Sequence, residues 1–184
     1  MGVHRRSFLV LSTFPWLGSV PRLVRAEDLY DDYINSTSKQ PFVGFLARQG
    51  SGDSVGHAFV GVGVRLDATL LVYERLFGLY PKNGALAGIK SVFGPVSGKL
   101  DATWDDVSWD TELVRVIDAG QKEKVLAQFD KWSSAAPQYS LVANGGMNCN
   151  SLVGDVARSL GMKVPNGSGA TRPWKFIDAL KSAN

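Results

Sequence analysis

Residues 148–165 read Asn-Cys-Asn-Ser-Leu-Val-Gly-Asp-Val-Ala-Arg-Ser-Leu-Gly-Met-Lys-Val-Pro, and the fold can be built outward from this segment. Its apolar residues recur at the three- and four-residue spacing of a helix that buries one face. Asn148 is suited to the N-cap, and Gly161 with Pro165 is suited to end the helix. The sequence therefore predicts a helix over Asn148–Leu160 with a buried stripe formed by Leu152, Val153, Val156 and Leu160.

Cys149 is the only cysteine of the chain, and it lies in the first turn of this predicted helix. It precedes Leu152 by three residues, so its side chain is expected to point towards the core. The unpaired N–H groups and partial positive charge of a helix N-terminus lower the pKa of a thiol there. The pattern thus indicates a candidate nucleophile, while a small buried apolar residue is the alternative.

His57 lies in a predicted strand, Val55–Val64, whose residues alternate between two faces. One face is aliphatic and consists of Ala58, Val60, Val62 and Val64. His57 is expected on the other face, beside Phe59 and two glycines. A cysteine and a histidine are the smallest pair able to attack an acyl carbon, with the histidine accepting and returning the proton. A structural histidine is the alternative.

The remaining segments predict an α+β domain with a mostly antiparallel sheet over residues 27–184. Gly78–Gly98 is rich in Gly, Pro and Lys and is expected to be a long loop that could hold a short helix. The other expected strands are Phe42–Arg48, Thr69–Phe77 and Ser108–Ile117, and the other expected helices are Glu27–Gln40, Asp118–Trp132 and one that starts near Pro173.

Residues 1–26 have the composition of an export signal. A basic start precedes a short apolar centre, and Val24-Arg25-Ala26 suits cleavage. The run Arg5-Arg6-Ser7-Phe8-Leu9 is typical of twin-arginine signals, with an ordinary Sec signal as the alternative. We therefore expect a periplasmic or secreted protein with no transmembrane segment after cleavage.

The net charge of +3 belongs to this signal rather than to the rest of the chain. Its removal lowers Lys+Arg from 20 to 16 while Asp+Glu stays at 17, which leaves a charge near −1. No basic stripe interleaved with aromatic residues remains, so no nucleic acid partner is predicted. One cysteine and one histidine cannot supply the usual metal ligands, so neither a metal nor another cofactor is predicted.

Several motifs resemble, in their order, the circularly permuted NlpC-like branch of the papain-fold cysteine peptidases and amidases, over about residues 57–165. The resemblance implies a papain-like sheet packed against the cysteine-bearing helix, with Cys149 as nucleophile and His57 as base. It also implies that the backbone N–H of Cys149 helps to bind the oxyanion. The motifs are Gly56-His57-Ala58-Phe59-Val60, Phe77-Gly78-Leu79-Tyr80-Pro81, Tyr139-Ser140-Leu141, Asn148-Cys149-Asn150-Ser151-Leu152-Val153 and Leu160-Gly161-Met162-Lys163-Val164-Pro165.

Such enzymes usually orient the histidine with a third polar group from the next strand. Glu74 interrupts an otherwise apolar face of that strand and is the first candidate, with Tyr80 as the alternative. A buried carboxylate needs a partner, which His57 would provide. A glutamate at a strand edge that faces water is the alternative. Asn148, Asn150 and Tyr80 are the candidate substrate-binding residues.

The leading hypothesis is an exported cysteine hydrolase that cleaves an amide bond, in cell-wall (peptidoglycan) peptide or in another amide substrate. Relatives of the resembled branch also include lipid acyltransferases similar to lecithin retinol acyltransferase, so acyl transfer to or from lipid is one alternative. A non-catalytic binding domain on the same fold is the other. No inhibitor or immunity protein can be named from the sequence.

Overall fold

The computed structural model of the chain describes residues 35, 38–50, 55–66, 70–101, 108–135, 137–142, 146–166 and 169–184. The predicted export signal, residues 1–26, lies outside these ranges. So does most of the predicted helix over Glu27–Gln40, and Gln40 itself begins the first strand.

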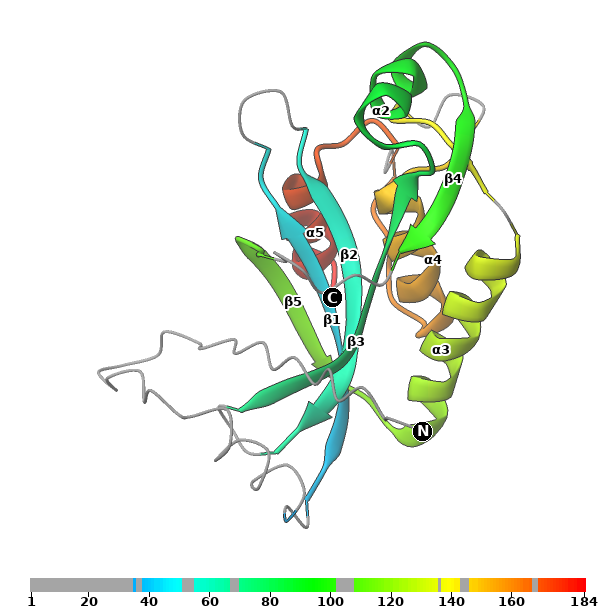
Figure 1. Cartoon of the computed structure of the whole chain (residues 1–184). Helices are drawn as coiled ribbons and strands as arrows, with labels where there is room; N and C mark the ends of the chain where they lie inside the picture. Colours follow the sequence, from blue (N-terminus) through cyan, green and yellow to red (C-terminus); the bar gives the residue numbers. More distant parts are fainter. Residues whose placement is uncertain are drawn as a thin grey trace, which may run out of the picture.

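An antiparallel sheet of six strands forms the centre of the described structure (Figure 1). Its order is β5-β1-β2-β3-β4-β6, and each neighbouring pair is antiparallel. This confirms the predicted α+β class and the mostly antiparallel sheet. The strands are β1 (Gln40–Arg48), β2 (His57–Arg65), β3 (Leu71–Pro81), β4 (Val96–Asp101), β5 (Thr111–Val116) and β6 (Gln138–Tyr139).

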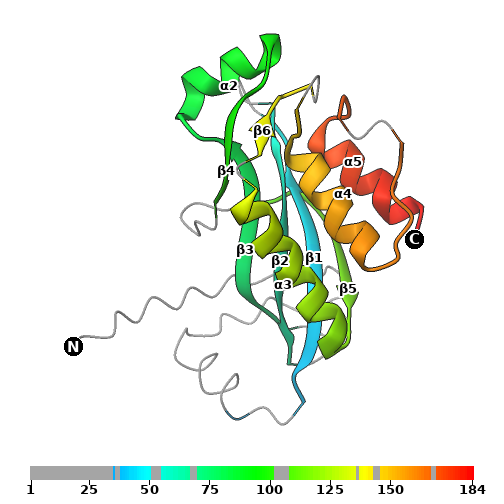
Figure 2. The same cartoon turned by 90° about the vertical axis from the view of Figure 1, so that its right-hand side faces the viewer.

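Four helices accompany the sheet in the described residues, namely α2 (Gly84–Phe93), α3 (Ala119–Ser134), α4 (Cys149–Ser159) and α5 (Pro173–Ser182). Figure 2 shows α3, α4 and α5 side by side over one face of the sheet, whereas α2 projects at one end beside β4. Asp118 caps α3 through a capping box with Gln121, which fixes where that helix begins. None of the helices in the described ranges is long and apolar enough to cross a membrane.

The two faces of the sheet carry different cores because neighbouring strand residues point to opposite sides. The main core lies under the helices and includes Ala58, Val60 and Val62 of β2 together with the buried side chains of α4. A smaller cluster covers the other face and consists of Phe42, Leu46, Phe59, Leu71, Tyr73 and Leu76. The alternation predicted for β2 is therefore the alternation observed.

The short helix expected within Gly78–Gly98 is present as α2, whereas the loop expected at the two ends of this segment is wrong. β3 continues to Pro81, α2 follows, and β4 begins at Val96. Two of the glycines that suggested turns, Gly78 and Gly98, instead allow close packing within β3 and β4. A Cβ on Gly78 would lie 2.5 Å from His57 Nε2, and one on Gly98 would lie 2.7 Å from the Pro137 carbonyl oxygen.

Substituting Gly61 tests how tightly the smaller cluster is packed. A Cβ there would overlap the buried Tyr73 ring and approach Leu76 Cδ2 to 2.7 Å. Gly61→Ala is expected to lower the free energy of unfolding by about 1–3 kcal/mol, as overpacking does. Urea unfolding measures the change as a shift of the midpoint, if the slope of the unfolding free energy against urea concentration is the same in both proteins.

Gly88→Ala is the matched control, since Gly88 lies within α2 and a Cβ there meets only Pro81 Cγ at 3.9 Å. The greater helix propensity of alanine over glycine should stabilise this variant by up to about 1 kcal/mol. Equal effects of the two substitutions would contradict the packing described for Gly61.

Candidate active site

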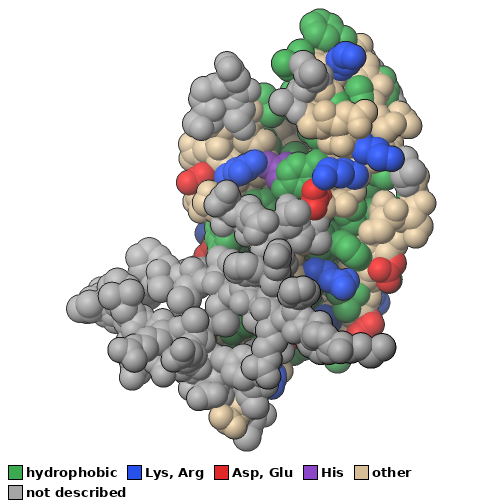
Figure 3. All heavy atoms as spheres, in the orientation of Figure 1, with side chains coloured by type: hydrophobic (Ala, Val, Ile, Leu, Met, Phe, Trp, Pro, Cys, Tyr) green, Lys and Arg blue, Asp and Glu red, His purple; other side chains and the backbone are tan. Residues whose placement is uncertain are grey.

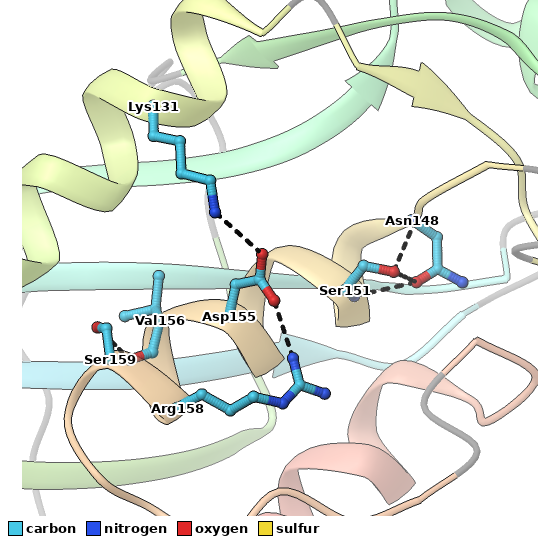
Figure 4. Close-up of polar contacts among 7 residues, drawn as sticks. All are labelled: Lys131, Asn148, Ser151, Asp155, Val156, Arg158 and Ser159. Carbon is cyan, nitrogen blue, oxygen red and sulfur yellow. Dashed lines mark hydrogen bonds and ion pairs between the residues drawn. The ribbon is translucent and has the colours of Figure 1, made fainter.

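The first turn of α4 is held by Asn148, which confirms the predicted N-cap. Asn148 Oδ1 accepts from the Ser151 N–H at 3.2 Å, and the Ser151 hydroxyl accepts from the Asn148 N–H at 3.2 Å (Figure 4). Asn148 Nδ2 donates to the carbonyl oxygens of Leu141 at 3.1 Å and Gly169 at 2.9 Å. One side chain thus caps the helix and ties two neighbouring segments to it.

Cys149 points into the main core, as its place on the helical stripe predicted. Only 5% of its surface is exposed, and the same core holds Ala58 and Val60 of β2. Burial raises the pKa of the Cys149 thiol above its ordinary value, whereas hydrogen bonds from the backbone N–H groups of Ala58, Asn150 and Cys149 itself oppose this rise. The expected lowering of the pKa is therefore wrong, because desolvation outweighs the helix N-terminus.

His57 begins β2 and lies on the face opposite the helices. Its ring stacks on Tyr80 with centroids 4.1 Å apart, lies 6.0 Å from the Phe59 ring, and passes over Gly78. Burial, and secondarily the charge of Arg48, lowers the pKa of His57 to about 3. The imidazole is therefore neutral at physiological pH. Its Nε2 is buried and has no hydrogen-bond partner among the described residues.

The imidazole of His57 and the thiol of Cys149 are not hydrogen-bonded in this conformation, since they lie on different faces of the sheet. They are nevertheless neighbours through the backbone. The N–H that bonds the sulfur belongs to Ala58, which follows His57 directly in the chain. The peptide joining His57 to Ala58 therefore touches the sulfur while the imidazole points away from it.

Each of the two side chains lines a cleft of its own. The cleft at Cys149 has a volume of about 180 Å³, and the cleft at His57 about 960 Å³. Val55, Gly56 and Leu141 line both, so the two clefts meet at the start of β2. In the orientation of Figure 1, the histidine colour shows between basic and hydrophobic side chains (Figure 3).

Glu74, the first candidate for orienting His57, lies elsewhere in the structure. The β2–β3 register shifts between Val62 and Gly63, whose partners are Arg75 and Tyr73, so Glu74 is the extra residue of a bulge. Its carboxylate bonds Lys122 of α3 at 2.5 Å. The bulge interrupts the alternation from which an inward-facing carboxylate was inferred, so the expected contact with His57 is wrong.

Tyr80, the alternative candidate, does contact His57 through the ring stack. Burial is the main cause that raises the pKa of Tyr80 to about 12. The charge of Arg48 lowers this pKa, whereas Asp101 and Cys149 raise it. Asn150, which was expected to bind substrate together with Asn148 and Tyr80, lines the Cys149 cleft. Its Nδ2 donates to the Thr171 carbonyl oxygen at 2.7 Å. Both asparagines thus hold the segments around Cys149 in place.

Sequence reasoning gave no role in the site to two residues near it, although one of them, Tyr139, belongs to a motif of the resemblance. Arg48 lies opposite His57 in the β1–β2 register and lowers its pKa. Tyr139 forms β6 and lines the His57 cleft, and its pKa is raised by burial and by Cys149. A basic residue at the end of the strand preceding His57 could have drawn attention to Arg48, but no pattern in the sequence places Tyr139 beside Cys149.

Comparisons with family models, curated proteins and solved structures find no match to this chain. Within the ranges that the structure describes, no group of three His, Cys, Asp or Glu side chains is placed to hold a metal ion.

The reactivity of Cys149 reports its pKa directly, because the thiolate is the species that iodoacetamide alkylates. We expect the native thiol to react slowly at neutral pH, with a rate that keeps rising above about pH 8.5, the value for a free thiol. The same chain unfolded in denaturant provides the control, since it has no other cysteine. A native rate that levels off below that pH would contradict a pKa raised by burial.

The low pKa of His57 predicts that acid destabilises the fold. The unfolded chain binds a proton below about pH 6.5, whereas folded His57 binds one only near pH 3, so stability is complete above 6.5 and falls as the pH drops towards 3. The loss attributable to His57 between about pH 7 and pH 5 is roughly 2 kcal/mol.

Urea unfolding of the native chain and of His57→Gln at these two pH values measures the loss of stability that His57 causes. The variant should lose less stability than the native chain because glutamine does not titrate. An equal loss in both proteins would show that His57 does not provide the effect.

Proposed function

We propose that the chain is an exported cysteine hydrolase of the permuted papain-like type, which cleaves an amide bond in peptidoglycan peptide. One observation carries the proposal: the Cys149 sulfur lies at the capped start of α4, in contact with the backbone N–H that follows His57. The antiparallel sheet behind this cysteine-bearing helix supports the same assignment. A periplasmic or secreted location is part of the proposal.

The backbone around Cys149 supports the roles of nucleophile and oxyanion site. The N–H groups of Ala58, Asn150 and Cys149 converge on the sulfur. When the sulfur attacks, the carbonyl oxygen of the substrate becomes an oxyanion bonded to the attacked carbon. It then lies within reach of the same three N–H groups. Fixed donors of this kind stabilise developing negative charge without reorganisation.

His57 acts as the base after the start of β2, where the two clefts meet, turns and carries the ring from Tyr80 towards Cys149. Its neutral state leaves a nitrogen able to accept a proton, and the unpartnered Nε2 gains a partner in that movement. A buried polar atom without a partner is costly, and such atoms are often explained by function. Loss of the ring stack opposes the movement by about 1 kcal/mol. Turning the first residue of β2 also breaks its pairing with Arg48 of β1.

The reaction then runs in two halves. The sulfur attacks the amide carbon while its proton passes to His57, and the C–N bond breaks as His57 protonates the leaving amine. His57 next takes a proton from water, which attacks the thioester and releases the carboxylic acid and the free thiol. In this account Tyr80 restrains the resting imidazole on the side away from Cys149.

Acyl transfer to or from lipid is the second candidate, and one observation favours it. Ile89, Val92 and Phe93 line the cleft at His57 and give one side of it an apolar surface. An acyl chain would fit such a surface better than a charged peptide would. A transfer assay with labelled phospholipid and an acceptor amine separates this activity from peptidoglycan cleavage.

Digestion of purified peptidoglycan tests the proposal. The native chain should release peptide fragments with new amino termini and leave new carboxylates on the other product, both detected by mass spectrometry. Cys149→Ala should abolish release, and His57→Ala should slow it by roughly 10²–10⁴-fold, as expected for loss of a general base. Glu74→Gln is the matched control and should retain full activity, because that carboxylate bonds Lys122 instead.

Release of the same products by Cys149→Ala would overturn the proposal. Absence of release by the native chain would confine the protein to another substrate, and absence of both peptide and lipid activity would favour a binding domain. Loss of activity in Glu74→Gln would contradict the position described for that residue.

A further inference from the structure

Helix α2 carries an exposed apolar stripe, which we call the α2 surface. It consists of Ile89, Val92 and Phe93, which are 63%, 44% and 88% exposed. Their spacing of three and four residues places them on one face of the helix. Ala87 and Ser91 are buried on the opposite face, so α2 is anchored by one side and offers the other to its surroundings.

Basic side chains flank the α2 surface without acidic partners. Arg48, Lys82 and Lys90 make no ion pair with any described residue, whereas the nearby Lys99 bonds Asp101 at 2.6 Å. Arg48 and Lys82 line the same cleft as the apolar stripe, and Lys90 belongs to α2 itself. Figure 3 shows hydrophobic and basic side chains together at this end of the molecule.

We propose that the α2 surface docks the protein onto an anionic phospholipid bilayer. Exposed apolar residues beside unpaired cations are the two components of interfacial helix binding: apolar side chains enter the acyl boundary and cations meet the headgroups. The ten-residue helix is far too short to span a bilayer. It therefore lies along the interface.

The shape of α2 favours a membrane over a protein partner. Figure 2 shows the helix projecting from the end of the sheet, beyond the layer formed by α3, α4 and α5. Phe93 is the most exposed residue of the α2 surface and the last residue of the helix. A projecting apolar side chain enters a fluid bilayer without a complementary pocket, whereas a protein partner has to provide one.

Docking through the α2 surface has a consequence for the cleft at His57. Ile89, Val92 and Phe93 also line that cleft, so its mouth would face the membrane surface. Substrates held at the bilayer would then reach the cleft in preference to those free in solution. This inference concerns where the protein binds, and it stands whether or not Cys149 is a nucleophile.

Co-sedimentation of the full chain with vesicles tests the proposal. The probes are vesicles of phosphatidylcholine alone and of phosphatidylcholine with phosphatidylglycerol. Binding is expected to the anionic vesicles and to weaken with salt, since the cations contribute electrostatically. The Ile89→Ser, Phe93→Ser double variant should bind at least about tenfold more weakly, because two large apolar side chains no longer enter the bilayer.

A second variant tests the charges separately. Lys82→Gln with Lys90→Gln should weaken binding to anionic vesicles by about fivefold per lysine and leave binding to neutral vesicles unchanged. The matched control is Val116→Ser with Lys124→Gln, since Val116 is 43% exposed on the distant β5 and Lys124 is exposed on α3. This control should bind like the native chain.

Three outcomes would overturn the proposal. The first is no binding of the native chain to anionic vesicles. The second is equal binding by the native chain and the Ile89→Ser, Phe93→Ser variant, which would assign any binding to other parts such as the basic residues 1–26. The third is self-association without vesicles that this variant abolishes, which would make a second copy of the chain the occupant. A thermal melt of each variant confirms that these exposed substitutions leave the fold intact.

Discussion

The packing of the first turn of α4 against β2 is the constraint on which the rest of the structure depends. Asn148 closes this turn and bonds the Leu141 and Gly169 segments, so the helix start, the end of β6 and the approach to α5 are fixed together. The same packing removes Cys149 from water. The raised pKa of the thiol follows from it, because the three N–H groups around the sulfur only partly replace water.

The sheet between α4 and His57 sets the chemistry that the site can perform. Cys149 packs on one face, and the His57 ring stacks with Tyr80 on the other, so the resting pair is a protonated thiol and a neutral imidazole. Charge separation to thiolate and imidazolium then has to accompany movement of the imidazole. Catalysis in this account is coupled to a rearrangement of the start of β2, at the point where the two clefts meet.

Local sequence patterns predicted the faces of strands and the start of the cysteine-bearing helix. Alternation placed the faces of β2, and helical spacing with Asn148 placed the start of α4 and the inward direction of Cys149. Three features depended on tertiary structure and were beyond local patterns. Gly78 allows His57 to pass instead of forming a turn, a bulge turns Glu74 towards Lys122, and the depth of burial reverses the expected sign of the Cys149 pKa shift. The faces of β2 and the inward direction of Cys149 were thus predictable, whereas the contacts of His57 and Glu74 and the extent of burial of Cys149 were not.

The central claim is that the His57 ring leaves Tyr80 and reaches the Cys149 sulfur in the working state. Dibromoacetone, a short reagent with two ends that alkylate thiols and imidazoles, tests this most directly. The account predicts a bridge between the peptides containing Cys149 and His57, found by mass spectrometry after digestion and formed faster in Tyr80→Leu, which lacks the ring stack. Modification of Cys149 alone, with His57 unmodified in both proteins, would contradict it.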